Sequence, residues 1–156
     1  MQESPLKKDG NIGFDCRKIF DKFRSSKMKN CPFCSIHSDI EQKEIISNEY
    51  CIFLQKPQEV LIGSGIIIPR RHCETVFDLS KEEWNSTFEL LNEVKKYLDE
   101  RYHPEGYNVG WNIGHIGGQE VFHAHLHVIP RYKDEPLSGK GIRHWLKQPI
   151  NKRNLW

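Results

Sequence analysis

Three histidines, His123, His125 and His127, alternate with apolar residues in one short stretch of the chain. Side chains of a β-strand switch faces at every residue, so this spacing predicts a strand over residues 120–131 with the three imidazoles on one face. The apolar residues of 122–128 would then pack on the core from the other face. Neighbouring histidines would start about 6.5 Å apart, a spacing suited to a phosphate and its ester bonds. Since an imidazole can act as nucleophile, acid or hydrogen-bond donor near neutral pH, this face is the candidate catalytic centre.

Two other interpretations of the histidines remain. They could be surface residues on an edge strand, although their strict alternation opposite an apolar face argues against this. They could also hold a catalytic metal, as three histidines do in zinc hydrolases. Two alternating histidines can bind one metal, but a third on the same strand reaches it awkwardly.

A second cluster with possible chemistry is Cys31-Pro32-Phe33-Cys34. The C-x-x-C spacing is half of a tetrahedral zinc site, which needs two further ligands. The alternatives are free thiols and a redox pair, but a redox pair is typical of a helix start after a strand, and that context is not evident here. Cys16, Cys51 and Cys73 are expected to fill buried or half-buried positions.

The elements around these residues predict an antiparallel α+β domain. Residues 44–55 are β-prone and are broken at 47–48, which indicates two strands and a short turn. Further strands are expected at 63–70 and 106–114. A short helix is expected over 15–29 from its apolar spacing.

The strongest helix signal begins at Ser80, where Ser80 and Glu83 form an S-x-x-E capping box. The helix should run to Arg101 and end before Pro104. Its stripe is expected to be core or dimer interface rather than a cofactor site. The stripe consists of Trp84, Phe88, Leu91, Val94, Lys95 and Leu98.

Length and composition set the remaining limits. The 156 residues fit one globular domain, and a net charge of +2 does not indicate a nucleic-acid or membrane partner. No apolar run is long enough to span a bilayer, and no secretory signal is evident, so a reduced, cytoplasmic protein is expected. We expect an N-terminal extension over 1–30, a domain over 31–133 and a basic C-terminal tail over 134–156. The cations of the tail, among them Arg143 and Lys147, could reach a polyphosphate or be solvated.

The stretch 118–131 (GQEVFHAHLHVIPR) resembles the signature of the histidine triad (HIT) superfamily, in which three histidines alternate with apolar residues. The resemblance extends upstream to Asn112-Ile113-Gly114, where the family has Asn-x-Gly, and to 68–72 (IPRRH), where it has a strand ending in Pro-Lys-x-His. It covers about 31–131, in the order of the family's elements. It implies a HIT-like fold, with an antiparallel sheet of about five strands, a long helix and a smaller N-terminal helix, in a homodimer.

The resemblance also implies hydrolysis or transfer of a nucleotidyl group at an α-phosphate. The substrates would be AMP-containing, as nucleoside phosphoramidates or dinucleoside polyphosphates are, and no organic cofactor would be needed. His125 would be the nucleophile and form a covalent nucleotidyl-histidine. His127 would donate to a non-bridging oxygen, and His123 would complete the triad.

Other positions of the family's site fall on the loop before the histidines and on one strand end. Asn112 and Gln119 would hold phosphate or leaving-group oxygens, although ordinary turn chemistry is the alternative for both. Backbone N–H groups near Gly118 would assist. Gln55 falls near the family's ribose-binding residue. The remaining positions of the binding loop are Glu120, where the phosphoramidase branch commonly has a small hydroxyl residue, and Val121.

In family members that carry the cysteine pair, the two further zinc ligands correspond to His72 and His123. The resemblance therefore implies a structural zinc on Cys31, Cys34, His72 and His123. Two rival functions are a nucleotide-binding sensor or scaffold without catalysis, and a metal-dependent phosphohydrolase. The natural leaving group, the preferred base and the role of Glu120 do not follow from the sequence.

Overall fold

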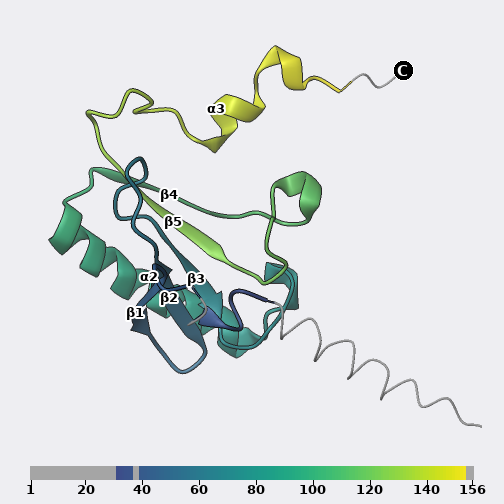
Figure 1. Cartoon of the computed structure of the whole chain (residues 1–156). Helices are drawn as coiled ribbons and strands as arrows, with labels where there is room; N and C mark the ends of the chain where they lie inside the picture. Colours follow the sequence, from purple (N-terminus) through teal and green to yellow (C-terminus); the bar gives the residue numbers. More distant parts are fainter. Residues whose placement is uncertain (1–30, 37–38, 154–156) are drawn as a thin grey trace, which may run out of the picture.

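A five-stranded antiparallel sheet forms the centre of the molecule in the computed structural model, which describes residues 31–36 and 39–153 (Figure 1). Its strands lie in the order β1-β2-β3-β5-β4, and each adjacent pair is antiparallel. Their bounds are β1 (Lys43–Ser47), β2 (Cys51–Gln55), β3 (Gly65–Pro69), β4 (Gly106–Trp111) and β5 (Leu126–Arg131). The expected α+β class and the number of strands are confirmed, while the helix expected at 15–29 lies outside the described residues.

The predicted turn between the first two strands is made by Asn48. Its Oδ1 accepts hydrogen bonds from the N–H groups of Tyr50 at 3.2 Å and Cys51 at 2.8 Å. An asparagine side chain often replaces backbone acceptors in this way in a tight turn. The break in the β-prone stretch therefore has a local cause.

Helix α2 (Lys81–Tyr102) begins and ends close to where the sequence predicts. The Ser80 side chain accepts from the Glu83 N–H, and the Glu83 carboxylate accepts from the Ser80 N–H, which completes the capping box. His103 ends the helix in the left-handed conformation at φ 50°, just before Pro104, which disfavours continuation.

The buried face of α2 differs from the predicted stripe. Val94 and Leu98 are fully buried as expected, but Trp84 and Phe88 are 53% and 65% exposed. The first turns of the helix instead bury Glu83, Ser86, Thr87 and Leu90. Polar residues can occupy this face because they are paired; for example, Thr87 Oγ1 donates to the Glu83 carbonyl at 2.8 Å.

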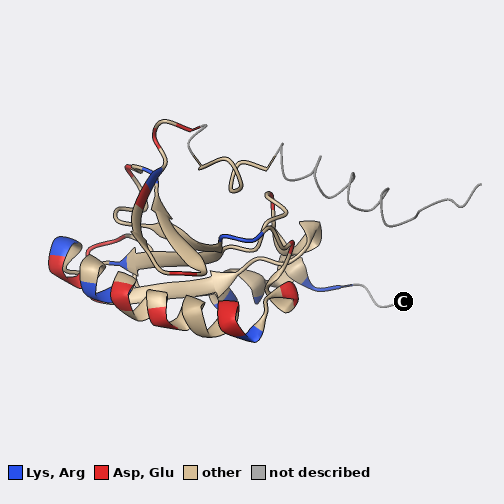
Figure 2. Cartoon of the chain, turned by 90° about the horizontal axis from the view of Figure 1, so that it is seen from below, with Lys and Arg blue, Asp and Glu red and all other residues tan. Residues whose placement is uncertain are grey.

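The sheet has two differently covered faces. Helix α2 covers one of them and carries its charged residues on the outer surface (Figure 2). The core between them comprises Cys51, Phe53, Ile67, Leu90, Val94, Leu98, Leu126 and Val128. On the other face Ile52, Leu54 and Ile68 form a smaller cluster, against which Phe33 and Ile36 pack. The segment after the cysteine pair therefore covers the face opposite to α2.

Shorter elements lie at the margins. They are the 3-10 turns η2 (Val76–Asp78), η3 (His115–Gly117) and η4 (Pro149–Asn151), and the helix α3 (Ile142–Leu146). Helix α3 lies in the C-terminal tail. None of the helices in the described part of the chain has the length and apolarity needed to cross a membrane.

The strand that was expected over 120–131 is shorter than predicted. β5 begins only at Leu126, and the segment before it is irregular. The His123 N–H bonds back to the Val121 carbonyl at 2.9 Å, and the Ala124 N–H bonds to Cys73 at 2.7 Å. These two N–H groups therefore do not take part in the β-sheet hydrogen bonding of β5. The prediction that one strand carries all three histidines is wrong.

Candidate active site and metal centre

The three histidines occupy different environments. Only His127 lies in β5, where it is half-buried and pairs with Ile66 of β3 and Gly110 of β4. His123 is 0% and His125 8% exposed, and both precede the strand. His125 and His127 still meet, with ring centroids 4.8 Å apart. The imidazoles of His125 and His127 thus lie side by side, while the His123 imidazole points into the protein interior.

His123 points toward the cysteine pair. Its Nδ1 lies 3.5 Å from the Cys31 Sγ and 3.6 Å from the Cys34 Sγ, and its Nε2 lies 2.9 Å from the Pro69 carbonyl oxygen. Burial lowers the pKa of His123 to about 4, an effect that the Pro69 hydrogen bond only partly opposes. An imidazole that is neutral at pH 7 has a lone pair available for a metal.

His72 completes a cluster of four candidate ligands. Its Nδ1 lies 3.3 Å from the Cys34 Sγ, and the four ligand atoms of Cys31, Cys34, His72 and His123 all lie within 4.8 Å of one another. Zn–S and Zn–N bonds of about 2.3 and 2.0–2.1 Å at tetrahedral angles require sulfur–nitrogen separations of about 3.6 Å. The three sulfur–nitrogen separations of 3.3, 3.5 and 3.6 Å are close to this requirement. The Pro69 carbonyl contacts the other ring nitrogen of His123, as an outer-shell partner of a metal ligand does.

Burial and the neighbouring Cys31 raise the pKa of the Cys34 thiol to about 12. Such a site disfavours a bare thiolate, whereas a coordinating cation stabilises one. The arrangement therefore suits a closed metal site better than a reactive redox cysteine, which needs a lowered thiol pKa.

A backbone group orients His125. Its Nδ1 lies 2.8 Å from the carbonyl oxygen of His123. A carbonyl oxygen can only accept, so Nδ1 carries the proton and Nε2 keeps its lone pair. The Phe33 ring packs edge-on against the imidazole with centroids 5.3 Å apart. His125 is therefore held in the tautomer that a nucleophile needs.

Asn112 and His127 converge beside this imidazole. Asn112 is exposed, and its Nδ2 lies 3.5 Å from the His127 Nε2 and donates to the Gly118 carbonyl at 3.3 Å. The pKa of His127 is lowered, first by burial and then by the proximity of His125. The lowered pKa favours the neutral form of the His127 imidazole.

The loop before the histidines folds on itself. Gly118 has φ 85°, a conformation that favours glycine. The N–H groups of Gly117, Gly118 and Gln119 donate to the Gly114 and His115 carbonyls, so these donors are not directed at a phosphate as expected. Among the described residues, none accepts a hydrogen bond from the N–H of Glu120 or Val121.

Gln119 holds this loop in place. Its side chain is 1% exposed, accepts from the Gly114 N–H at 2.9 Å, and donates to the Glu74 and Val121 carbonyls at 2.6 and 3.1 Å. All of its donors are used inside the protein. In this structure the Gln119 side chain holds the turn of the loop together.

Gln55, which the family resemblance places near the ribose-binding residue, lies on the face of the sheet that α2 covers. Gln55 shares a sheet face with Phe53, which packs toward α2, because the two residues are two positions apart in β2. Its Nε2 donates to the Gly63 carbonyl at 2.7 Å and its Oε1 faces the Tyr97 hydroxyl at 3.5 Å. His127 lies on the opposite face, since its neighbours Leu126 and Val128 face α2.

Sequence reasoning missed an apolar surface beside the histidines. Ile66 lies directly across from His127, and Ile66, Phe33 and Ile36 each pack against the buried cluster of Ile52, Leu54 and Ile68. Phe33, an aromatic residue between the candidate metal ligands Cys31 and Cys34, was the feature of the sequence that could have indicated this apolar surface. Glu120 and Val121 line a cavity of about 510 Å³ together with Glu74, His72 and Cys31.

Comparisons with known proteins agree with this geometry. The family model described as the HIT domain matches residues 37–134. The chain is 31% identical over 105 residues to the Bacillus subtilis protein named Protein hit, covering 67% of this chain and 72% of that protein. It is 29% identical over 127 residues to an adenosine 5′-monophosphoramidase of Schizosaccharomyces pombe, covering 81% and 90%. It is 32% identical over 95 residues to a bis(5′-adenosyl)-triphosphatase of Dictyostelium discoideum, covering 60% and 64%.

Solved structures give the same result. A HIT family protein from Bacillus anthracis has a TM-score of 0.61 at 31% identity, over 67% of this chain and 75% of that one. A zinc-bound histidine triad family protein from Mycobacterium smegmatis has a TM-score of 0.62 at 27% identity, over 72% and 82%. Together with the match over residues 37–134, these likenesses show that the chain belongs to the HIT domain family.

Proposed function

We propose that the protein hydrolyses or transfers nucleotidyl groups at an α-phosphate, with His125 as the nucleophile. The observation that carries this proposal is the 2.8 Å contact between the His125 Nδ1 and the His123 carbonyl, because it leaves the Nε2 lone pair free for attack. The family contains relatives named as a phosphoramidase and a diadenosine triphosphatase. Both of those reactions release an adenylate.

The chemistry runs in two displacements at one phosphorus atom. Nε2 of His125 forms a bond to the α-phosphorus and the bond to the leaving group breaks, so that the leaving group takes the electron pair of that bond and a proton from solvent. Water then attacks the same phosphorus and gives up a proton to solvent, the Nε2–P bond breaks with its electron pair returning to Nε2, and a nucleoside monophosphate leaves. His127, Asn112 and the N–H groups of Glu120 and Val121 are the donors proposed to bind the phosphate oxygens.

The apolar surface beside His125 suits the base. Phe33, Ile66 and their neighbours offer aromatic and aliphatic contact on the same face as His127. A purine stacks well on such a surface. We therefore assign the nucleoside to this side of the imidazole and the leaving group to the other.

We also propose that Cys31, Cys34, His72 and His123 bind zinc. Their separations fit a tetrahedral ion, and a zinc-bound relative of the same fold exists. The ion would bind the N-terminal segment to the residue whose carbonyl orients His125. Such a site requires reduced cysteines, which fits a cytoplasmic setting.

A homodimer is the third part of the proposal. β4 is an edge strand, and beside it Trp84, Phe88 and Val109 are 53%, 65% and 41% exposed. With Leu91 and Trp111 they line an apolar cavity of about 240 Å³. Exposed apolar surface next to an unpaired strand edge is typical of a self-association site.

The experiment is a comparison of wild type with His125→Ala on adenosine phosphoramidate and on diadenosine tri- and tetraphosphates. We expect the variant to bind nucleotide but to lose at least about three orders of magnitude in turnover, as nucleophile removal does elsewhere. Mass spectrometry of the wild type quenched during turnover should show an adenylyl adduct. Wild-type rates in the variant would contradict the mechanism. Binding without turnover in the wild type would instead favour a nucleotide sensor.

A further inference from the structure

The C-terminal end carries a concentration of positive charge. Residues 136–153, here called the cationic strap, contain no Asp or Glu. Its basic residues are Lys140, Arg143, Lys147, Lys152 and Arg153. In the part of the chain that the structure describes, none of these five lies in an ion pair, whereas Lys56, Arg71 and Arg131 all have carboxylate partners. The strap therefore offers uncompensated positive charge to an anion.

Arg131 anchors the strap to the strand that carries His127. Its guanidinium group pairs with Glu135 at 2.7 Å and contacts Asn108 of β4. It also donates to the Leu137 and Lys140 carbonyls at 3.1 and 3.4 Å. A planar group with five donors can fix several segments at once. The path of the strap from the end of β5 is thus set by hydrogen bonds.

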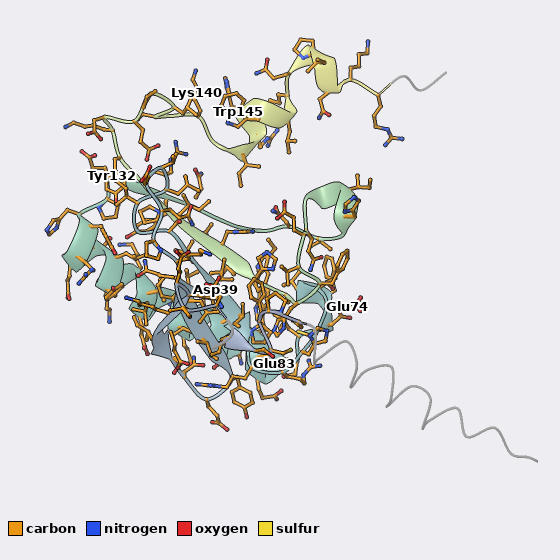
Figure 3. All side chains as sticks on the ribbon, viewed as in Figure 1. Asp39, Glu74, Glu83, Tyr132, Lys140 and Trp145 are labelled. Atoms are coloured by element: carbon orange, nitrogen blue, oxygen red, sulfur yellow. The ribbon has the colours of Figure 1, made fainter. Side chains whose placement is uncertain are left out.

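The strap then passes over the catalytic face. Ile142 Cδ1 lies 3.6 Å from where a β-carbon on Gly110 would be, and Gly110 is the cross-strand partner of His127. Its neighbours Val109 and Trp111 face α2, so Gly110 opens toward the histidine side. Figure 1 shows α3 beyond β4 and away from α2, and Figure 3 shows Lys140 and Trp145 along the strap.

We propose that the cationic strap binds the polyphosphate part of the leaving group and so favours dinucleoside polyphosphates over phosphoramidates. This inference rests on the proposed function, because it needs an α-phosphate at His125 and His127. Arg143 follows Ile142 directly and Lys147 lies one turn further, and both are exposed. A polyphosphate leaving group brings further negative charges, which guanidinium and ammonium groups bind well. An amine leaving group brings none.

The test compares Arg143→Gln/Lys147→Gln with the wild type on diadenosine triphosphate and adenosine phosphoramidate. We expect kcat/KM for the triphosphate to fall roughly three- to tenfold, as loss of two exposed charge contacts implies. The phosphoramidate rate should not change. The Arg143→Lys/Lys147→Arg variant should retain the preference. Lys81→Gln/Lys96→Gln is the matched control, since it removes the same charge from exposed positions on α2.

Two binding measurements, the ionic-strength dependence of the triphosphate KM and the affinity for inorganic tripolyphosphate, distinguish loss of anion binding by the strap from a folding defect. The triphosphate KM of the wild type should rise with ionic strength more steeply than that of the strap variant. Inorganic tripolyphosphate should bind the strap variant roughly three- to tenfold more weakly than the wild type, by calorimetry. Equal effects on both substrates, or no effect on either substrate and on tripolyphosphate, would overturn the inference. Full activity of His125→Ala would overturn the proposed function, and the tripolyphosphate measurement would still decide the strap.

Discussion

The guanidinium group of Arg71 donates two hydrogen bonds to the Glu83 carboxylate, Nε to Oε1 at 2.8 Å and Nη2 to Oε2 at 2.7 Å. Glu83 is buried and also caps α2, while Arg71 directly precedes the candidate ligand His72. This pair therefore joins the start of the long helix to the strand exit that carries a candidate metal ligand.

The Arg71–Glu83 pair should make stability depend on acid pH. Its hydrogen bonds hold the pKa of Glu83 below the ordinary 4.5, so the stabilisation is fully present above that value and is lost as pH falls through the folded pKa. Glu83→Gln should cost about 1–3 kcal/mol at pH 7, since Arg71 is partly exposed and the capping bond is also affected. The difference from wild type should shrink below about pH 4.5.

Urea unfolding from pH 3 to pH 7 measures this dependence. Glu89→Gln is the control, because Glu89 is exposed on the same helix. A Glu83→Gln deficit that stays constant across the range would show that the charge of Glu83 does not matter.

Gln119 should behave as a structural residue and Asn112 as a functional one. Gln119→Ala leaves the partner groups of the loop without bonds and should cost about 2–4 kcal/mol of stability. Asn112→Ala, at an exposed position, should change stability by less than about 0.5 kcal/mol and should lower turnover. Thermal unfolding and steady-state rates on the same samples separate the two effects. An Asn112→Ala enzyme of full activity would remove Asn112 from the site.

Metal analysis should find about one zinc per chain, as a closed four-ligand site requires. Cys34→Ser and His72→Gln should lose it and unfold at lower temperature, because the N-terminal segment loses its attachment. Cys73→Ala, at a buried cysteine outside the cluster, is the control that should keep zinc. A zinc-free wild type whose stability is unchanged by added zinc would contradict the site.

The exposed aromatic residues of α2 should control the oligomeric state. Trp84→Glu/Phe88→Glu should convert a dimer to monomers, because charges placed in an apolar interface are costly to desolvate. Light scattering after size exclusion measures the mass. Phe77→Glu is the control, since Phe77 is 82% exposed and lies outside this patch. A monomeric wild type would refute the interface.

Features that depend on residues close together in the sequence could be predicted. The capping box of Ser80 and Glu83, the turn at Asn48 and the C-x-x-C pair each depend on neighbours within three residues. The grouping of Cys31, Cys34, His72 and His123 followed from the family resemblance, and the structure brings the four together. Their distances depend on the whole fold and could not be calculated from spacing.

The sequence pattern did not predict where the histidine strand begins or which part of the α2 stripe is buried. The histidine strand begins at Leu126 and not at the predicted residue 120. The Ala124 N–H donates to the Cys73 carbonyl, a partner that is distant in sequence and that strand alternation does not reveal. On α2 the stripe was expected to be core or dimer interface: Val94 and Leu98 lie in the core, whereas Trp84 and Phe88 are exposed and belong to the proposed dimer surface.

His123 serves two centres through different atoms: its ring faces the two cysteines, and its carbonyl orients His125. With zinc bound as proposed, loss of the ion would release the His123 ring, and the carbonyl that orients the proposed nucleophile His125 would move with it. A partly metal-loaded preparation would then be a mixture of competent and incompetent molecules. Active-site titration would count the loaded fraction, while the competent molecules would each turn over at the full rate.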